Sequence, residues 1–123
     1  MVRGVIVKLL VVGSRGINDV EFVCNEIDQY NDVDTIISGG ALGVDTIAEM
    51  WADKNGIPTI IIKPDYKKYF RKAPVLRTID MIEKADQVLA IWDGKSKGTG
   101  HAIRIAKLKG KPVKEVIYED DLW

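Results

Sequence analysis

The sequence contains one cysteine, Cys24, and one histidine, His101, among its 123 residues. A single thiol excludes an intrachain disulfide framework, and one thiol with one imidazole excludes a metal site built from Cys and His clusters. We therefore expect no metal centre. Without disulfides, the ordinary setting for such a chain is the reduced cytoplasm.

Long hydrophobic runs and an excess of one charge are also missing. The most apolar stretch, residues 5–12, includes Lys8 and is too short to cross a bilayer, so no membrane segment is expected. The 18 Lys and Arg residues balance 18 Asp and Glu residues, which gives a formal net charge of zero. This balance argues against a protein built as a whole to bind nucleic acid.

Two familiar nucleotide motifs are absent as well. The sequence holds no G-x-x-x-x-G-K-[ST], which argues against P-loop NTPase chemistry. The glycines of Gly13-Ser14-Arg15-Gly16 do not follow the G-x-G-x-x-G pattern. An ordinary NAD dehydrogenase is therefore not expected either.

What the sequence does contain is a regular alternation of strand-like apolar runs and helical periodicity. Strands are expected at about 5–12, 34–38, 58–63, 87–92 and 112–118, with helices between them. Asn18 and Glu21 have the form of a capping box for the first helix, and residues 63–74 are expected to form a loop before the helix that begins at Pro74. The pattern predicts one α/β domain over residues 1–123. Its fold would be a Rossmann-like, doubly wound parallel sheet of about five strands, in the order 3-2-1-4-5, with helices on both faces.

Glycine-bearing loops follow the first, second and fourth of these strands. One such loop alone would equally fit a tight turn between a strand and a helix. Three of them, however, would meet at the carboxyl edge of the sheet, where helix N-termini and exposed backbone N–H groups attract phosphate. The candidate ligand-binding residues are Gly13, Ser14, Arg15, Ser38, Gly39, Gly40, Ala41, Gly43, Asp45, Asp93, Ser96, Gly98, Thr99 and Gly100, with Arg77 from the helix after Pro74.

The polar members of this set suggest distinct roles. Arg15 and Arg77 can bind phosphate oxygens, and Ser96 with Thr99 can bind a second anionic group. Asp45 is either an acceptor for ribose hydroxyls or a partner of its own helix dipole. The histidine His101 either contacts the ligand or is a solvated, capping residue.

Residues 66–72, Tyr-Lys-Lys-Tyr-Phe-Arg-Lys, interleave aromatic rings with cations. Such a patch can stack bases and bind phosphates. Alternatively, the rings dock on the sheet while the charges stay solvated, and we favour this second arrangement. In both cases the segment would be placed to cover the predicted site.

The motifs together resemble those of the SLOG superfamily, and more narrowly its YspA-like branch. The resemblance is carried by Gly-Ser-Arg at 13–15, Ser-Gly-Gly-Ala-x-Gly-x-Asp at 38–45 and Gly-Thr at 98–99. It extends to Tyr-Lys-Lys-Tyr at 66–69, Ala-Pro at 73–74, and Arg77 with Met81. It implies a Rossmann-like domain that senses or processes a nucleotide or nucleotide-derived ligand. Two related groups are the LOG-type phosphoribohydrolases and the DNA-processing protein of natural transformation.

Two positions depart from the patterns of these relatives. Thr78 follows Arg77 where relatives often carry Asn. In the LOG-type pattern P-G-G-x-G-T-x-x-E, the glutamate position falls on Ala102, which has no acid function. Transfer of the hydrolase activity would therefore need another carboxylate, and Asp45, Asp80 and Asp93 are the candidates.

Three functions remain open from the sequence. The first is a binding module for a nucleoside phosphate or an ADP-ribose-like ligand, with no further cofactor. The second is a nucleotide phosphoribohydrolase with Asp45 as its acidic group, and the third is a single-stranded nucleic-acid binder. A homo-oligomer is a further expectation, with Trp123 as the natural contact outside the core.

Overall fold

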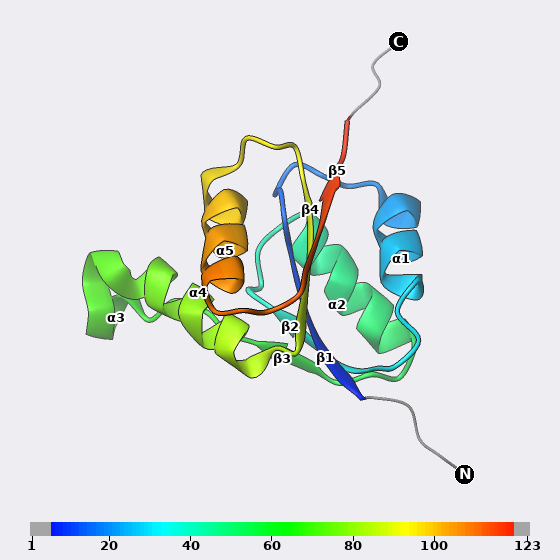
Figure 1. The fold of residues 1–123 in the computed structure, drawn as a ribbon, viewed down its shortest axis with the longest axis horizontal. Coiled ribbons are helices and arrows are strands. Elements are labelled where there is room, and N and C mark those ends of the chain that lie inside the picture. Colours follow the sequence, from blue (N-terminus) through cyan, green and yellow to red (C-terminus); the bar gives the residue numbers. More distant parts are fainter. Residues whose placement is uncertain (1–5, 120–123) are drawn as a thin grey trace.

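The computed structural model describes residues 6–119. Its centre is a parallel sheet of five strands in the order β3-β2-β1-β4-β5, which confirms the predicted α/β class and strand order (Figure 1). The central strand β1 pairs with both neighbours, so that Leu10 lies beside Ile37 on one side and Val88 on the other. The strands are β1 (Val7–Gly13), β2 (Val33–Ser38), β3 (Thr59–Ile61), β4 (Gln87–Trp92) and β5 (Val113–Ile117).

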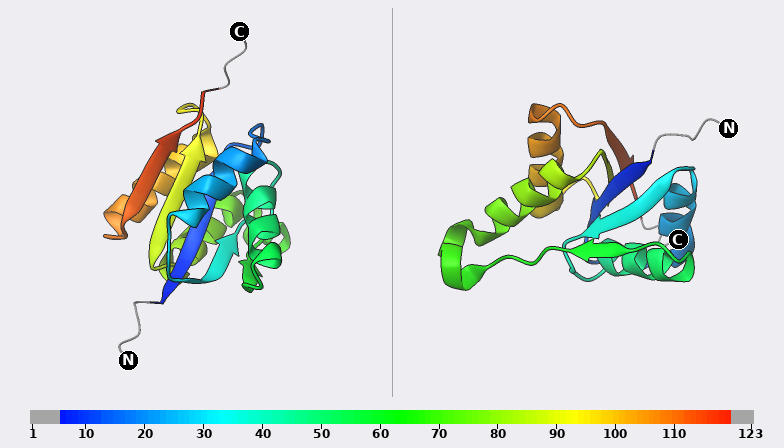
Figure 2. Two further views of the ribbon diagram at one scale, coloured as in Figure 1. Left: turned by 90° about the vertical axis from the view of Figure 1, so that its right-hand side faces the viewer. Right: turned by 90° about the horizontal axis from the view of Figure 1, so that it is seen from below.

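Helices cover both faces of the sheet, as predicted. Helices α1 (Val20–Asp28) and α2 (Val44–Lys54) pack on one face, and α4 (Ala73–Lys84) and α5 (Lys97–Leu108) pack on the other (Figures 1 and 2). Because side chains alternate along a strand, β1 supplies both cores. Leu9 and Val11 join the α1–α2 side, while Leu10 and Val12 join the α4–α5 side.

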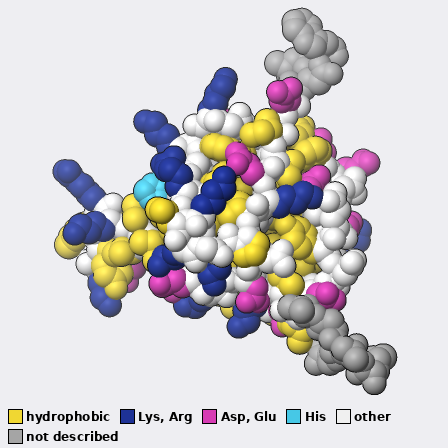
Figure 3. Space-filling view, viewed as in Figure 1, with side chains coloured by type: hydrophobic (Ala, Val, Ile, Leu, Met, Phe, Trp, Pro, Cys, Tyr) yellow, Lys and Arg dark blue, Asp and Glu magenta, His cyan; other side chains and the backbone are white. Residues whose placement is uncertain are grey.

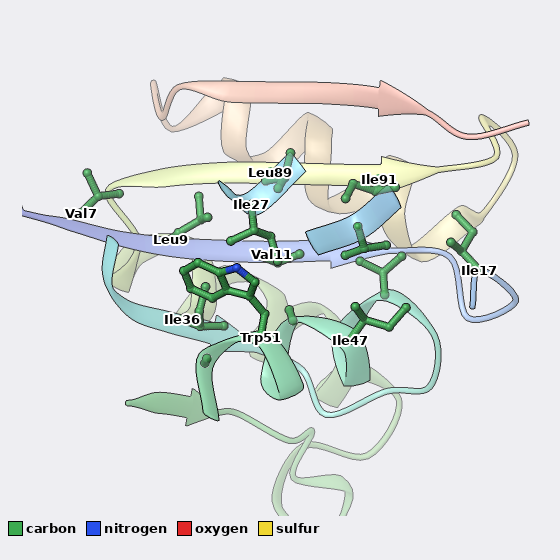
Figure 4. Close-up of a cluster of buried hydrophobic side chains, with 14 residues drawn as sticks. Val7, Leu9, Val11, Ile17, Ile27, Ile36, Ile47, Trp51, Leu89 and Ile91 are labelled. Carbon is green, nitrogen blue, oxygen red and sulfur yellow. The ribbon is translucent and has the colours of Figure 1, made fainter. Parts of the chain in front are cut away.

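Trp51, a residue of α2, lies in the core between the sheet and the helices α1 and α2. Its ring lies against the strand residues shown in Figure 4, and its side chain is 8% exposed. The indole Nε1 donates a hydrogen bond to Asp28 Oδ1 at 2.8 Å, so the polar end of the ring is satisfied at the end of α1. The bond ties α2 to α1.

The start of the first helix differs from the prediction. Asp19, and not Asn18, is the N-cap of α1, and its Oδ1 accepts a hydrogen bond from Phe22 N–H at 3.0 Å. A helix that begins one residue later places Val23 and Ile27 in the core and leaves Val20 47% exposed. The expected capping box at Asn18 was therefore wrong.

The segment 63–74 is not the unstructured loop that the sequence predicted. It contains the short helix α3 (Tyr66–Tyr69) and the 3-10 turn η1 (Phe70–Lys72), and Asp65 caps α3 by accepting a hydrogen bond from Lys68 N–H at 3.1 Å. The preceding strand β3 is only three residues long, shorter than the expected 58–63. One turn of helix is too short for hydrophobic periodicity to reveal it, and these residues have no buried face.

Two further expectations concern surfaces. In the described part of the chain, no helix is both long and apolar enough to cross a membrane. The predicted contact at Trp123 lies outside the described residues.

Gly13 lies where β1, β4 and α2 pack closely together. A Cβ at this position would lie 2.2 Å from the carbonyl oxygen of Ile91 and 2.6 Å from Val44 Cβ. Backbone atoms on one side and a buried branched side chain on the other leave no room for a methyl group. The sequence therefore needs glycine here for packing, before any ligand is considered.

We expect Gly13→Ala to lower the free energy of unfolding by about 1–3 kcal/mol, because the overpacked methyl group must displace backbone. Urea unfolding followed by circular dichroism measures this change. The matched control is Gly16→Ala in the same loop, where no atom lies within 4 Å of the Cβ position. Equal stability of the two variants would contradict the packing account.

Candidate functional site

A cavity of about 1050 Å³ opens at the carboxyl ends of β1, β2 and β4. It is lined by residues from four segments, 12–19, 39–45, 74–81 and 93–102, together with Tyr118. This is the edge at which the strand order reverses between β1 and β4, where open parallel sheets bind their ligands. The volume is at the upper end of the range for small-molecule sites.

Most of the residues predicted from the sequence meet in this cavity, although they are spread over more than eighty positions of the chain. Those that line it are Gly13, Ser14, Arg15, Gly39, Ala41, Asp45, Arg77, Asp93, Ser96, Gly98 and Thr99. Ser38, Gly40, Gly43 and Gly100 are not among the lining residues.

Ser38 and Gly40 help to hold the conformation of the loop after β2. The Ser38 hydroxyl donates a hydrogen bond to Glu49 Oε2 at 2.6 Å and accepts one from Gly40 N–H at 3.1 Å. Gly40 has a φ of +73°, and a Cβ there would lie 3.0 Å from the Ile61 side chain. Any side chain at position 40 would therefore strain the loop itself, so this glycine is needed for the loop conformation.

Gly43 and Gly100 allow close packing between elements. A Cβ on Gly43 would lie 2.5 Å from the carbonyl oxygens of Ser14 and Arg15, so this glycine lets the first two loops touch. A Cβ on Gly100 would lie 3.2 Å from the ring of Trp92, in the contact between α5 and β4. Both glycines belong to the scaffold of the cavity.

A hydrogen-bond network joins the first and third loops. The hydroxyls of Ser14 and Ser96 lie 2.8 Å apart, and Asp93 N–H donates to Ser14 Oγ at 3.1 Å. Asp93 Oδ1 in turn accepts hydrogen bonds from the backbone N–H groups of Lys95 (2.8 Å) and Ser96 (2.9 Å). These bonds lower the pKa of Asp93 to about 2, and the bond from Lys95 contributes most. Its carboxylate thus stabilises the conformation of the third loop.

The first turn of α5 is the part of the cavity best suited to an anion. Its first intrahelical bond runs from Gly100 N–H to Ser96 O at 3.0 Å, so the N–H groups of residues 97–99 have no acceptor within the helix. No atom lies within 4 Å of a Cβ built on Gly98, which leaves the approach to this turn open. Thr99, a buried residue that lines the cavity, adds a hydroxyl. The helix dipole favours negative charge at this point.

Basic side chains lie around the same turn. The cations Arg15 and Lys97 line the cavity, and so does His101. Arg15 is exposed, and its side chain makes no ion pair with any residue in the range 6–119. It is therefore available to pair with a ligand phosphate.

The first turn of α2 looks similar in sequence but already contains a negative charge. Asp45 is 7% exposed, and its Oδ2 accepts a hydrogen bond from Ala41 N–H at 3.1 Å. Burial raises the pKa of Asp45 to about 6, although the Ala41 N–H and the Arg77 guanidinium oppose the shift. Because a carboxylate occupies the positive end of α2, a phosphate is disfavoured there and a hydroxyl donor is favoured.

Arg77 holds the loop after β2 against α4. Its Nη1 donates hydrogen bonds to the carbonyl oxygens of Gly39 (3.0 Å) and Ile62 (3.3 Å). Gly39 makes room for it, because a Cβ there would lie 2.7 Å from Arg77 Nη1. The Nε of Arg77 is buried and has no hydrogen-bond partner among the described residues, so it is a donor that the loop does not use.

The structure adds lining residues that the loop motifs did not predict. Among them are Val75, Thr78 and Met81 from α4, and Tyr118 from the chain after β5. Val75 could have been predicted, because it lies at the exposed end of the apolar stripe of α4. Nothing in the sequence placed Tyr118 beside Asp19. The Tyr118 hydroxyl donates a hydrogen bond to Asp19 Oδ2 at 3.0 Å.

Residues 66–72 are not among the lining residues, so they do not cover the cavity as the sequence had suggested. Ala102, the LOG-type glutamate position, does line it and is 3% exposed. Within residues 6–119, no three His, Cys, Asp or Glu side chains lie close enough together to bind a metal ion.

The raised pKa of Asp45 predicts a pH-dependent stability difference. Between about pH 4 and pH 6 the folded chain holds the proton that the unfolded chain has lost, so rising pH destabilises the fold. Asp45→Asn removes this titration. The stability of wild type relative to the variant should therefore fall by about 2–3 kcal/mol between pH 4 and pH 7. Urea unfolding across this range measures it.

The control for this prediction is Asp53→Asn, which changes an exposed carboxylate near the other end of the same helix. A difference between wild type and Asp45→Asn that does not change with pH would show that the burial of this carboxylate does not shift its titration.

Comparison with solved structures supports the fold. DNA processing protein A (DprA) from Streptococcus pneumoniae is similar with a TM-score of 0.72 at 22% identity, over 95% of this chain and 52% of that one. DprA from Helicobacter pylori, in a structure concerned with single-stranded DNA binding, is similar with a TM-score of 0.70 at 22% identity. That match covers 91% of this chain and 66% of the other. The chain thus spans about half to two thirds of these proteins and shares their fold.

Sequence comparison finds a relative of higher sequence identity than these two structures. The Gene 61 protein of Mycobacterium phage D29 is 33% identical, over 86% of this chain and 93% of the phage protein. The family model described as YspA, cpYpsA-related SLOG family matches residues 7–69, which contain the first two loops of the cavity. The chain therefore belongs to the YspA, cpYpsA-related SLOG family.

Proposed function

We propose that this protein binds a nucleotide-derived ligand, a nucleoside phosphate or an ADP-ribose-like molecule, in the cavity at the carboxyl edge of the sheet. One observation carries the proposal. The open first turn of α5 and the buried carboxylate of Asp45 face the same cavity. The first suits a phosphate and the second suits the hydroxyls of a ribose.

The phosphate would bind at α5. Backbone N–H groups of residues 97–99 and the Thr99 hydroxyl are donors, and the absent side chain of Gly98 lets a phosphate approach them. Arg15 would add a charge-assisted pair from the first loop. Because Ser14 and Ser96 are hydrogen-bonded to each other, the loops that carry these donors are fixed in place.

The sugar would bind toward α2. Asp45 is mostly ionised at neutral pH with a pKa near 6, and an ionised carboxylate accepts hydrogen bonds from ribose hydroxyls. Strand β1 lies between β2 and β4, so the two ends of the site are separated by about two strand spacings, roughly 10 Å. A phosphate and the sugar or base attached to it fit a site of this length.

Hydrolysis of an N-glycosidic bond is the second candidate function, and it is favoured by Asp45 alone. Three carboxylates line the cavity. Asp19 is bonded to Phe22 and Tyr118, and Asp93 holds its own loop. Asp45 is the one whose pKa lies near the working pH of a general acid or base. Asp80, the remaining sequence candidate, is paired with Lys84 and does not line the cavity.

A thermal-shift screen tests the proposal, with AMP, ADP, NAD, ADP-ribose and ribose-5-phosphate as ligands. At about 100 times its dissociation constant, a ligand adds about 2.7 kcal/mol of stability, which for a domain of this size raises Tm by roughly 10 °C. Thr99→Val and Arg15→Ala should each weaken binding about tenfold to hundredfold, because each removes a bond to a charged phosphate. Arg104→Ala, an exposed arginine of α5 outside the cavity lining, is the matched control.

An equal thermal shift in Thr99→Val, Arg15→Ala and Arg104→Ala would contradict the assignment of the phosphate to α5.

Mass spectrometry of the same mixtures reports turnover. Free base released by the wild type and not by Asp45→Asn would establish the second function in addition to binding. An oligonucleotide competitor is included because H. pylori DprA binds single-stranded DNA. Its displacement of a bound nucleotide would place a nucleic-acid strand in the cavity.

A further inference from the structure

Residues 66–72 form an arm, α3 with η1, that stands away from the body of the protein. Figure 1 and the right-hand view of Figure 2 show it projecting beyond the sheet and its helices. All seven residues are exposed, and none of them lines the cavity. The sequence had favoured rings docked on the sheet, and this expectation was wrong. The arm therefore has no part in the function proposed above.

The arm carries unneutralised positive charge. Four of its seven residues are Lys67, Lys68, Arg71 and Lys72, and none of the seven is acidic. Within the described part of the chain, none of these four cations makes an ion pair. Four lysines of the body, at positions 84, 107, 109 and 114, each pair with a carboxylate. Figure 3 shows Lys and Arg side chains, in dark blue, among hydrophobic side chains on the projecting end.

The other three residues of the arm are aromatic and face solvent. Phe70 is 73% exposed, Tyr66 59% and Tyr69 39%. Phe70 also has a φ of +52°, and it is the one non-glycine residue with positive φ among residues 6–119. A large ring is thus held in water by a backbone conformation that L-residues rarely adopt. Four cations without an ion pair lie in the same segment, one of which, Lys68, has its Nζ over the Tyr69 ring at 5.2 Å from the centroid. Backbone strain of this kind concentrates at functional positions.

We infer that the arm binds single-stranded nucleic acid. Exposed rings interleaved with cations provide stacking faces for unpaired bases and counter-charges for the phosphates between them. Paired bases in a duplex do not offer such faces. A membrane surface fits less well, because two of the three rings carry hydroxyl groups and α3 has only four residues, too few for a continuous apolar face.

The experiment is fluorescence anisotropy of the whole protein with a labelled oligothymidylate of twenty nucleotides over a range of salt concentrations. Phe70→Ala should weaken binding roughly five- to hundredfold, as expected for one lost stack. Lys67→Ala/Lys72→Ala should lower the slope of log affinity against log salt by about 0.7 for each lost phosphate contact. The control Lys107→Ala/Lys109→Ala removes the same charge from the body and should leave both the affinity and the slope near wild type.

The alternative outcomes are distinct. Equal losses in the arm and control variants, or no binding of the oligomer, would overturn the inference. Loss on Arg15→Ala with none on the arm variants would place the strand in the cavity. Arm-dependent binding to phosphatidylserine vesicles without binding to the oligomer would identify a membrane surface instead. Because the arm variants should keep the nucleotide thermal shift, failure of this inference is separable from failure of the nucleotide proposal.

Discussion

The buried charge of Asp45 is the constraint on which the site depends. A carboxylate that is 7% exposed must be stabilised by neighbours, and the Ala41 N–H and the Arg77 guanidinium serve this purpose. Arg77 also donates hydrogen bonds to the backbone carbonyls of Gly39, directly after β2, and Ile62, directly after β3. Asp45, bonded to Ala41, and Arg77, bonded to Gly39, therefore both hold the loop between β2 and α2, one from α2 and the other from α4. Because Asp45 occupies the first turn of α2, the first turn of α5 is the helix end left for an anion in the proposed function.

Two helix N-termini that look alike in sequence thus have different chemistry. The first turn of α2 holds its own carboxylate, whereas the first turn of α5 follows Ser96, whose hydroxyl is bonded to Ser14 and Asp93 and does not cap the helix. Under the proposed function, the anionic end of the ligand would bind at α5 and its hydroxyl-bearing part at α2. This arrangement suits a nucleoside phosphate.

The sequence predicted the order of the strands because they alternate regularly with helices along the chain. It predicted most of the cavity because the loops after parallel strands meet at one edge of the sheet. It did not predict the N-cap at Asp19, since Asn18 and Asp19 are both good caps and only the core contacts of Val23 and Ile27 choose between them. It included Gly43 and Gly100 in the site because a glycine needed for packing cannot be told from one needed for a ligand without coordinates. It singled out the aromatic and basic residues 66–72 but expected them in a loop, because one helical turn has no detectable period.

The most direct test of the central claim is a titration of the ¹⁵N-labelled protein with ADP-ribose, followed by amide chemical shifts. The account predicts the largest changes at Gly98 and Thr99, smaller ones at Ser14 and Ala41, and none along the arm at residues 66–72. Changes of that size at the α2 turn with none at the α5 turn would show that the anion binds beside Asp45, and would contradict the account.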